Sequence, residues 1–205
     1  MIKRVIQRLK ELSIMDYISM NNISMDTVRT YTELMLTRRG YTIGDFMDTD
    51  EEGIPGKKPR LEVTKPDGTK AIVFFVHKKN KADKVTINVV KAIISMAKEI
   101  THILIVHDTV LTPDAKQNIT NSTDELIALY QFETFTFDDL SYDLLDVQRH
   151  SPDITILTKA PPQANRLPVL LASDPLARYL RIRPGDIVQG RFGDEMITIR
   201  RCVNA

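Results

Sequence analysis

The side chains that usually carry chemistry stand at spacings that do not favour joint action. The chain has four histidines and one cysteine, Cys202. Nucleophilic catalysis needs a base within reach of the nucleophile, and the sequence shows neither a Gly-x-Ser-x-Gly elbow nor a Cys/His arrangement with a usable thiol. His102 and His107 bracket an apolar run, and five-residue spacing points them to opposite faces of a strand. We therefore expect core or surface histidines, and a buried strand thiol at Cys202.

One arrangement resembles metal-dependent phosphodiester cleavage. Asp67 precedes a branched and aromatic segment that ends just before Lys79, so these two residues could stand where such nucleases place the first acid and the lysine. The acid expected two residues before the lysine is replaced by His77, and Phe75 and Val76 lack the oxygen ligands that Mg²⁺ requires. Phosphate-cradling glycine motifs are absent from the sequence. We expect no catalytic residue, no metal and no cofactor.

Composition indicates an ordered chain. Of 205 residues, 42% are hydrophobic and 27% charged, and the net charge is +1. The apolar stretches at 71–76 and 103–106 are shorter than the ~18 residues of a membrane span, and charges interrupt the first residues too often for a signal peptide. We expect a cytoplasmic or nuclear protein without a membrane contact. The near-neutral charge predicts weak DNA binding by the chain alone.

The first 140 residues alternate helical and strand signals. Apolar spacing predicts a helix from residue 2 to residues 21–22, and a second helix after a Ser24 cap that stops at Gly40. Acidic residues, Gly and Pro at 44–59 indicate a loop. The 65–68 turn predicts a hairpin of strands 61–64 and 69–77, and a helix with Val89, Val90, Ile93, Ile94 and Ala97 inward then leads to a buried strand at 102–106. This order predicts an α/β crossover.

Later signals mark a second domain. Thr112 and Pro113 indicate a helix start, and Phe132, Phe135, Phe137 and Leu140 form a further apolar cluster. From residue 150 the pattern changes to short strands broken by prolines. Asp174-Pro175 predicts one short helix with Leu176, Tyr179 and Leu180 inward, and turns at 183–186 and 193–194 separate strands at 187–192 and 195–203. The boundary is expected near 141–150.

Two surfaces carry basic residues. Residues 151–205 hold eight Lys and Arg against five Asp and Glu, which favours a docking surface. A second group clusters around the two loops of the first domain. Its members are candidate contacts to a DNA backbone within a larger assembly: Lys57, Lys58, Arg60, Lys78, Lys79, Lys81 and Lys84.

Several segments resemble a known family. VTINVVKAIISMAKEITHILIVHDTVLTPDAKQNI at 85–119 is similar to the helix, strand and TPSA-type element of the small subunit shared by the eukaryotic nuclear RNA polymerases. SDPLARYLRIRPGDIVQGRF at 173–192 is similar to the DP-x-A-x-Y and G-[DE]-x-V signature of that subunit and of its archaeal homologue. Other residues fall in matching order: Arg39-Gly40-Tyr41, Pro59-Arg60, Glu133, Phe135, Leu140 and His150.

The resemblance implies a fold and a role. It implies an N-terminal α/β jaw domain at 1–140, of a truncated restriction-endonuclease-like type, and a small mixed α+β assembly domain at 148–205. The jaw would lie near downstream DNA, and the assembly domain would dock on the largest polymerase subunit among other polymerase subunits, without forming homo-oligomers. The implied motif and docking residues are Thr112, Pro113, Asp114, Ala115, His150, Asp174, Pro175, Ala177, Tyr179, Gly185, Asp186 and Val188.

The sequence also departs from the family. Asp114 replaces the usual serine of the TPSA-type element, and the glycine expected shortly after Tyr179 is missing. These departures favour a copy encoded by a large DNA virus of the asfarvirus type, found in the host cytoplasm and virion, over a cellular nuclear subunit. Two alternatives stay open, which are a degenerate restriction-endonuclease-like DNA-binding protein and a free adaptor with the same fold.

Overall fold

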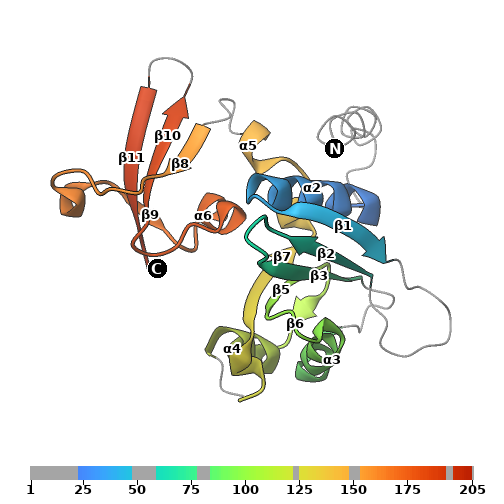
Figure 1. Ribbon diagram of the computed structural model, residues 1–205. Helices are drawn as coiled ribbons and strands as arrows, with labels where there is room; N and C mark the ends of the chain where they lie inside the picture. Colours follow the sequence, from blue (N-terminus) through green and yellow to red (C-terminus); the bar gives the residue numbers. More distant parts are fainter. Residues whose placement is uncertain are drawn as a thin grey trace. The chain divides into compact units, whose positions relative to one another are not determined.

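In the residues that the structure describes, strand pairing forms three sheets, and the chain divides into two units. The computed structural model describes residues 23–47, 59–77, 84–121, 125–147, 153–192 and 196–204. The chain divides into Met1–Ser141 and Tyr142–Ala205. Both units mix helices with strands (Figure 1). The helix expected over the first twenty residues lies outside the described residues, as does His150. In the described part, no helix is long and apolar enough to cross a membrane.

A five-stranded mixed sheet forms the centre of the first unit. Its strand order is β1-β2-β3-β5-β7. The hairpin expected at 61–77 is confirmed, because β2 and β3 pair antiparallel, and β5 and β7 then continue the sheet in parallel with β3. The strands are β1 (Thr42–Met47), β2 (Arg60–Thr64), β3 (Lys70–Val76), β5 (His102–His107) and β7 (Gln131–Thr136).

The first strand corrects the loop expected at 44–59. Residues 44–47 belong to β1, which pairs with β2 through a register shift between Ile43 and Phe46. A Cβ built on Gly44 would lie 2.5 Å from the carbonyl oxygen of Glu62, so only glycine allows this close approach. The bulge and the glycine break the alternation by which a strand is recognised in a sequence.

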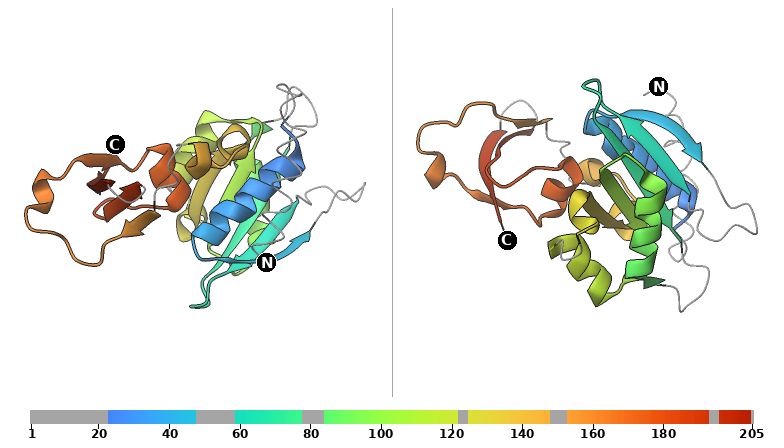
Figure 2. Two further views of the ribbon diagram at one scale, coloured as in Figure 1. Left: turned by 90° about the horizontal axis from the view of Figure 1, so that it is seen from above. Right: turned by 60° about the horizontal axis from the view of Figure 1, so that its bottom comes forward.

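Helices cover both faces of this sheet. β3 and β5 are apolar on both faces, as expected for strands inside an α/β layer. One face packs on α3 (Ile87–Ala97) and α4 (Pro113–Asn121), with Ile93, Ile105 and Ala115 fully buried. The other face lies under α2 (Met25–Arg38), as Figures 1 and 2 show. The expected helix at 89–97 is confirmed, and Val89 is only partly buried against this core.

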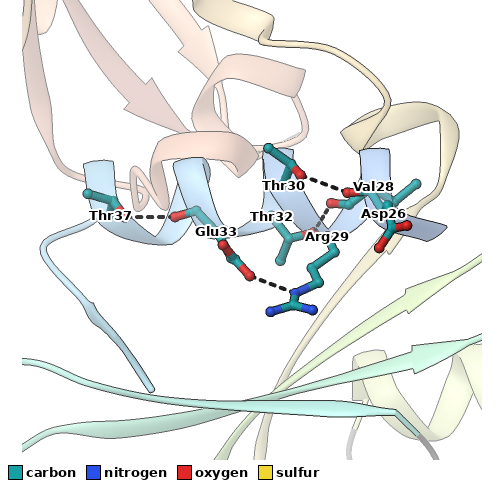
Figure 3. A network of polar contacts seen from close by, with 7 residues as sticks. All are labelled: Asp26, Val28, Arg29, Thr30, Thr32, Glu33 and Thr37. Carbon is teal, nitrogen blue, oxygen red and sulfur yellow. Dashed lines mark hydrogen bonds and ion pairs between the residues drawn. The ribbon is translucent and has the colours of Figure 1, made fainter. Parts of the chain in front are cut away.

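Threonines let α2 turn a polar sequence toward the core. Ser24 caps the helix by accepting a hydrogen bond from the Thr27 amide at 3.1 Å, as the sequence predicted. The buried hydroxyls of Thr30 and Thr32 donate to the backbone carbonyls of Asp26 and Val28, one turn back, at 2.7 Å (Figure 3). The helix itself therefore satisfies both hydroxyl donors. Gly40 ends the helix with φ +82°, the expected left-handed stop.

Short elements complete the crossover from β3 to β5 and β7. β4 (Lys84–Val85) pairs in parallel with β6 (Val110–Leu111) as a separate two-stranded sheet. The turn of 3₁₀-helix η2 (Ile127–Leu129) precedes β7, and η3 (Asp138–Leu140) follows it. The apolar cluster expected at 132–140 is therefore split among β7, Phe137 and η3.

The second unit is a four-stranded sheet with one helix on one face. Its strand order is β8-β10-β11-β9, and β9 is parallel to β11. The core joins Leu170, Val188 and Cys202 to Ala177 and Ile182. The elements are α5 (Leu144–Val147), β8 (Asp153–Ile156), η4 (Ala164–Arg166), β9 (Val169–Leu171), α6 (Pro175–Leu180), β10 (Ile187–Phe192) and β11 (Met196–Val203).

Cys202 is a buried strand thiol, as expected. Its relative exposure is 1%, and burial raises the pKa of the thiol, with a smaller contribution from the Asp186 carboxylate. The neutral thiol is therefore the form that the folded unit favours. Since this is the chain's one cysteine, its alkylation reports opening of the second unit alone.

The end of α6 adopts a backbone conformation that suits glycine best. Arg181 ends the helix in the left-handed conformation, with φ +58° and ψ +41°. Only glycine adopts this conformation without a Cβ penalty, which is about 1–2 kcal/mol for other residues. The second unit thus keeps the helix stop without the residue that suits it best.

We expect Arg181→Gly to be more stable than Arg181→Ala by about 1 kcal/mol, because both variants lose the same side chain and only glycine relieves the backbone. Urea titration followed by alkylation of Cys202 measures the free energy of unfolding of this unit. Equal stability of the two variants would contradict the strained stop.

Candidate functional site

A buried polar cluster connects the end of α2 to β5 and β7. Nη2 of Arg39 lies 2.9 Å from Oε2 of Glu133, and the arginine side chain is 2% exposed. Oε1 of the same carboxylate lies 2.7 Å from Nε2 of His102. The other ring nitrogen, Nδ1, is 3.1 Å from the Tyr41 hydroxyl. Four side chains that come from three distant segments therefore form one continuous network.

Aromatic and aliphatic side chains enclose this cluster. The Arg39 guanidinium lies 5.6 Å from the centre of the Phe135 ring, and Leu140 is completely buried. Lys65 lies 4.8 Å above the Tyr41 ring, within the range of cation–π attraction. The Arg39-Gly40-Tyr41 and Glu133-x-Phe135 matches thus converge in one place. Their order is visible in the sequence but their contact is not, and the sequence did not identify His102 as a member.

The cluster suits a structural role, because it offers little access for a substrate. Tyr41 and His102 are each 4% exposed. Removal of one partner of a buried ion pair is costly, because it leaves the other charge buried and unpaired. Its chemical role is therefore to position α2 and β1 against β7.

A different pair of side chains lies where the parallel strands end. His77 follows β3 and Asp108 follows β5, and Nδ1 of the histidine is 2.6 Å from Oδ2 of the aspartate. The His77 ring stacks on Phe137, which follows β7, at a centroid distance of 5.9 Å. The carboxyl ends of parallel strands commonly carry ligand sites. The rule that such ends meet could have identified this pair from the sequence, but the pair was not among the expected sites.

Asp67 does not join that pair. It lies in the turn before β3, accepts a hydrogen bond from the Thr69 amide at 2.9 Å, and is fully exposed. That hydrogen bond lowers the pKa of its carboxyl group. Because β3 rises about 3.3 Å per residue, its two ends are about 20 Å apart. Asp67 and His77 therefore lie about one strand length apart, and Lys79 lies outside the described residues.

Metal binding finds little support elsewhere. The described ranges contain no group of three His, Cys, Asp or Glu side chains that could hold a metal ion. Nδ1 of His107 donates to the carbonyl oxygen of Thr109 at 2.6 Å, and the histidine is 6% exposed. His102 belongs to the cluster above. The two histidines expected to lie apart on opposite faces of β5 therefore have different partners.

The TPSA-like element begins α4. The Thr112 hydroxyl accepts from the Ala115 amide at 3.3 Å, and its backbone amide donates to the Val85 carbonyl at 3.0 Å. Ala115 is fully buried, whereas Pro113 and Asp114 are exposed. The predicted helix start is confirmed. Asp114, the residue that differs from the TPSA-type pattern, is exposed.

The C-terminal signature forms the frame of the second unit. Asp174 caps α6 by accepting from the Leu176 amide at 2.8 Å, with Pro175 at the first position. The inner face expected for this helix is confirmed at Tyr179, because Ala177 and Tyr179 are 0% and 1% exposed. Leu176 and Leu180 are partly buried, and Val188 joins the core.

The turn before β10 completes this frame. Gly185 has φ +98°, and an Asp186 carboxylate oxygen accepts from the Arg183 amide at 2.7 Å. The turn predicted at 183–186 is confirmed. The strands predicted at 187–192 and 195–203 are confirmed as β10 and β11.

The candidate DNA-backbone contacts lie mostly outside the described residues, namely Lys57, Lys58, Lys78, Lys79 and Lys81. Lys84 is exposed on β4. Arg60 is half-buried on β2, and its Nε atom is buried with no hydrogen-bond partner in the described part of the chain. The described residues therefore bring no basic patch together here.

Comparison with known proteins adds a distant structural likeness. No family model matches the sequence, and no curated protein matches it. Among solved structures, the MspJI restriction endonuclease in complex with a 27-mer oligonucleotide is similar at a TM-score of 0.36 and 14% identity. The match covers 54% of this chain and 26% of the endonuclease chain.

We expect Glu133→Ala to lower the free energy of unfolding of the first unit by about 3 kcal/mol, because it removes the carboxylate from the buried guanidinium and imidazole. Glu62→Ala, an exposed change in the same sheet, should cost less than about 0.5 kcal/mol. Urea denaturation followed by circular dichroism measures both, with Cys202 alkylation as the control that the second unit is unchanged. Additive costs in an Arg39→Ala/Glu133→Ala variant would show that the pair is not coupled.

Proposed function

We propose that the chain is a non-catalytic subunit of a multisubunit DNA-directed RNA polymerase. In this proposal the first unit supports the downstream-DNA jaw as a truncated restriction-endonuclease-like domain. The second unit docks on the largest subunit. The protein needs no cofactor and acts in transcription as one copy within the enzyme. A viral copy would work in the host cytoplasm and be carried in the virion, and a cellular copy would work in the nucleus.

One observation carries the proposal. The residues of the family resemblance are used to build the two folds, in the Arg39–Glu133 cluster and in the frame of α6 and β10. Residues retained for catalysis would instead converge on an accessible centre. A framework role for the matching residues is what a structural subunit requires, and fold alone would not assign it.

Strand order supports the finer description of the jaw. A helix, an antiparallel β1-β2-β3 ladder and a crossover through α3 to parallel β5 follow one another, as a restriction-endonuclease-like domain requires. The runner-up, a degenerate DNA-binding nuclease, would depend on the His77–Asp108 pair at the carboxyl ends. That pair can relay a proton, but the described residues add no third His, Cys, Asp or Glu side chain that could complete a metal site.

We expect the purified chain to leave duplex DNA uncut in the presence of Mg²⁺ or Mn²⁺, because Asp67 and the His77–Asp108 pair lie at opposite ends of β3. A supercoiled-plasmid assay measures cleavage in wild type, Asp67→Ala and His77→Ala. Cleavage that disappears in either variant would favour an active nuclease over a subunit without catalysis.

We expect the second unit to determine incorporation into the polymerase. Coexpression with the largest subunit should recover wild type, and Asp174→Ala at most mildly less, since loss of a helix cap costs about 1 kcal/mol. Tyr179→Ala should be largely lost from the complex, because truncation of a buried aromatic costs about 3–5 kcal/mol.

Two variants control this experiment. Tyr142→Ala removes a tyrosine of the same unit that is 40% exposed, and it should copurify as wild type does. Glu133→Ala weakens the first unit and should also be retained. If Glu133→Ala is lost while Tyr179→Ala remains, assembly belongs to the first unit.

A further inference from the structure

One side of β11 is left open along most of its length. β10 pairs with β11 from Met196 to Arg201. On the opposite side, β9 pairs only with Arg201–Val203 (Figure 1). In the described ranges, residues 196–200 therefore have a strand on one side only. An unpaired strand edge presents backbone donors and acceptors that another chain can use.

The backbone directions along this edge follow from two hydrogen bonds. The Cys202 amide donates to the Asp186 carbonyl on the β10 side, at 2.8 Å. The Arg201 amide donates to the Pro168 carbonyl on the other side, at 2.9 Å. Since these directions alternate along a strand, the amides and carbonyls of Ile197 and Ile199 are directed to the open side.

Apolar and basic side chains flank this edge. Ile197 is 57% exposed and lies on the same face as Ile199 and the β9 residues Val169 and Leu171, which are 50% and 46% exposed. Arg200 alternates to the other face and is exposed. A strand that added here would lie beside Ile197 and Ile199 on one face, which also carries Arg191 and Arg201, and beside Arg200 on the other face.

We propose that the open edge of β11 at 197–200 binds an extended segment of the largest polymerase subunit in which apolar and acidic residues alternate. This inference rests on the proposed function. Main-chain hydrogen bonds would supply affinity, and alternate side chains would supply selectivity. Apolar side chains of the partner lie beside Ile197 and Ile199, and a carboxylate lies beside Arg200.

Charge selects this occupant over a second copy of the chain. Arg200 and Arg201 lie on β11 itself and Arg191 stands opposite Ile197 on β10, so joining two copies at this edge would place two sets of arginines on one continuous sheet. Like charges across a strand pair are destabilising, whereas opposite charges stabilise. An acidic partner strand relieves the repulsion that a second copy would create.

The first experiment needs no polymerase. The probe is a short capped peptide in which Val and Glu alternate, titrated into the full ¹⁵N-labelled chain. Amide shifts should be confined to β9 and β11, and the Ile197 and Ile199 amides should become protected from hydrogen exchange. A peptide in which Lys replaces Glu should bind about tenfold more weakly or not at all.

A matched pair of prolines tests the edge itself. Ile199→Pro removes an amide hydrogen that is directed to the open side, so it blocks strand addition without breaking the β10 ladder. Ile156→Pro makes the same change on the outer edge of β8. The neighbouring Leu157 amide donates to the Ile187 carbonyl across the β8–β10 pair, so the Ile156 amide is directed to the opposite, outer side. Unchanged alkylation of Cys202 verifies that both variants keep the unit folded.

We expect Ile199→Pro to weaken peptide binding about tenfold and to lose the coexpressed largest subunit, with Ile156→Pro equal to wild type in both. Arg200→Glu should lose the Val/Glu peptide, whereas Arg166→Glu, an exposed change in the same unit, should retain it.

Each outcome decides a separate point. No binding of the Val/Glu peptide overturns the edge as an acceptor, as does an Ile199→Pro variant that copurifies as wild type does. If the peptide binds at the edge but the wild-type chain never copurifies with the largest subunit, the polymerase is not the partner. The edge then still stands as a strand acceptor. Concentration-dependent dimerisation that Ile199→Pro abolishes overturns the acidic partner in favour of a second copy.

Discussion

The ion pair between Arg39 and Glu133 is the contact on which the arrangement of the first unit depends. It joins the end of α2 to β7, two elements almost a hundred residues apart, within a sheet whose core packing is apolar and not directional. Apolar packing tolerates many relative positions at similar cost. A buried carboxylate shared by a guanidinium and an imidazole tolerates few, because displacement leaves charge without its partner. The pair therefore selects one placement of α2 and β1 over the sheet.

Local signals were enough to predict the elements that have caps and turns of their own. Ser24, Gly40, Thr112, Asp174 and Gly185 each act within a few residues, and the structure places each where the sequence indicated. β1 was not predicted, because its bulge and Gly44 remove the alternation of apolar and polar residues that marks a strand. The sequence of β7 indicates only an apolar cluster, since four of its six side chains are polar.

The candidate site was harder to predict for a related reason. Which residues meet is decided by strand order, and a sequence does not display that order directly. Asp67 and His77 lie close in sequence and far apart in space, because a strand runs between them. His77 and Asp108, or His102 and Glu133, are about thirty residues apart and touch, because β3, β5 and β7 are neighbours in parallel. Parallel pairing converts distant strand ends into adjacent groups.

The two units use charge differently, and this difference bears on what each can bind. In the first unit, Arg39 is paired inside the fold and Arg60 is half-buried, and exposed lysines such as Lys70, Lys91 and Lys116 stand on separate elements, β3, α3 and α4. In the second, Arg191 and Arg200 stand exposed on neighbouring strands beside unpaired backbone groups. Nucleic-acid binding by charge alone needs many such cations along one face. A few arginines that flank a strand edge suit an acidic polypeptide instead, because backbone hydrogen bonds provide the attraction that so small a charge could not.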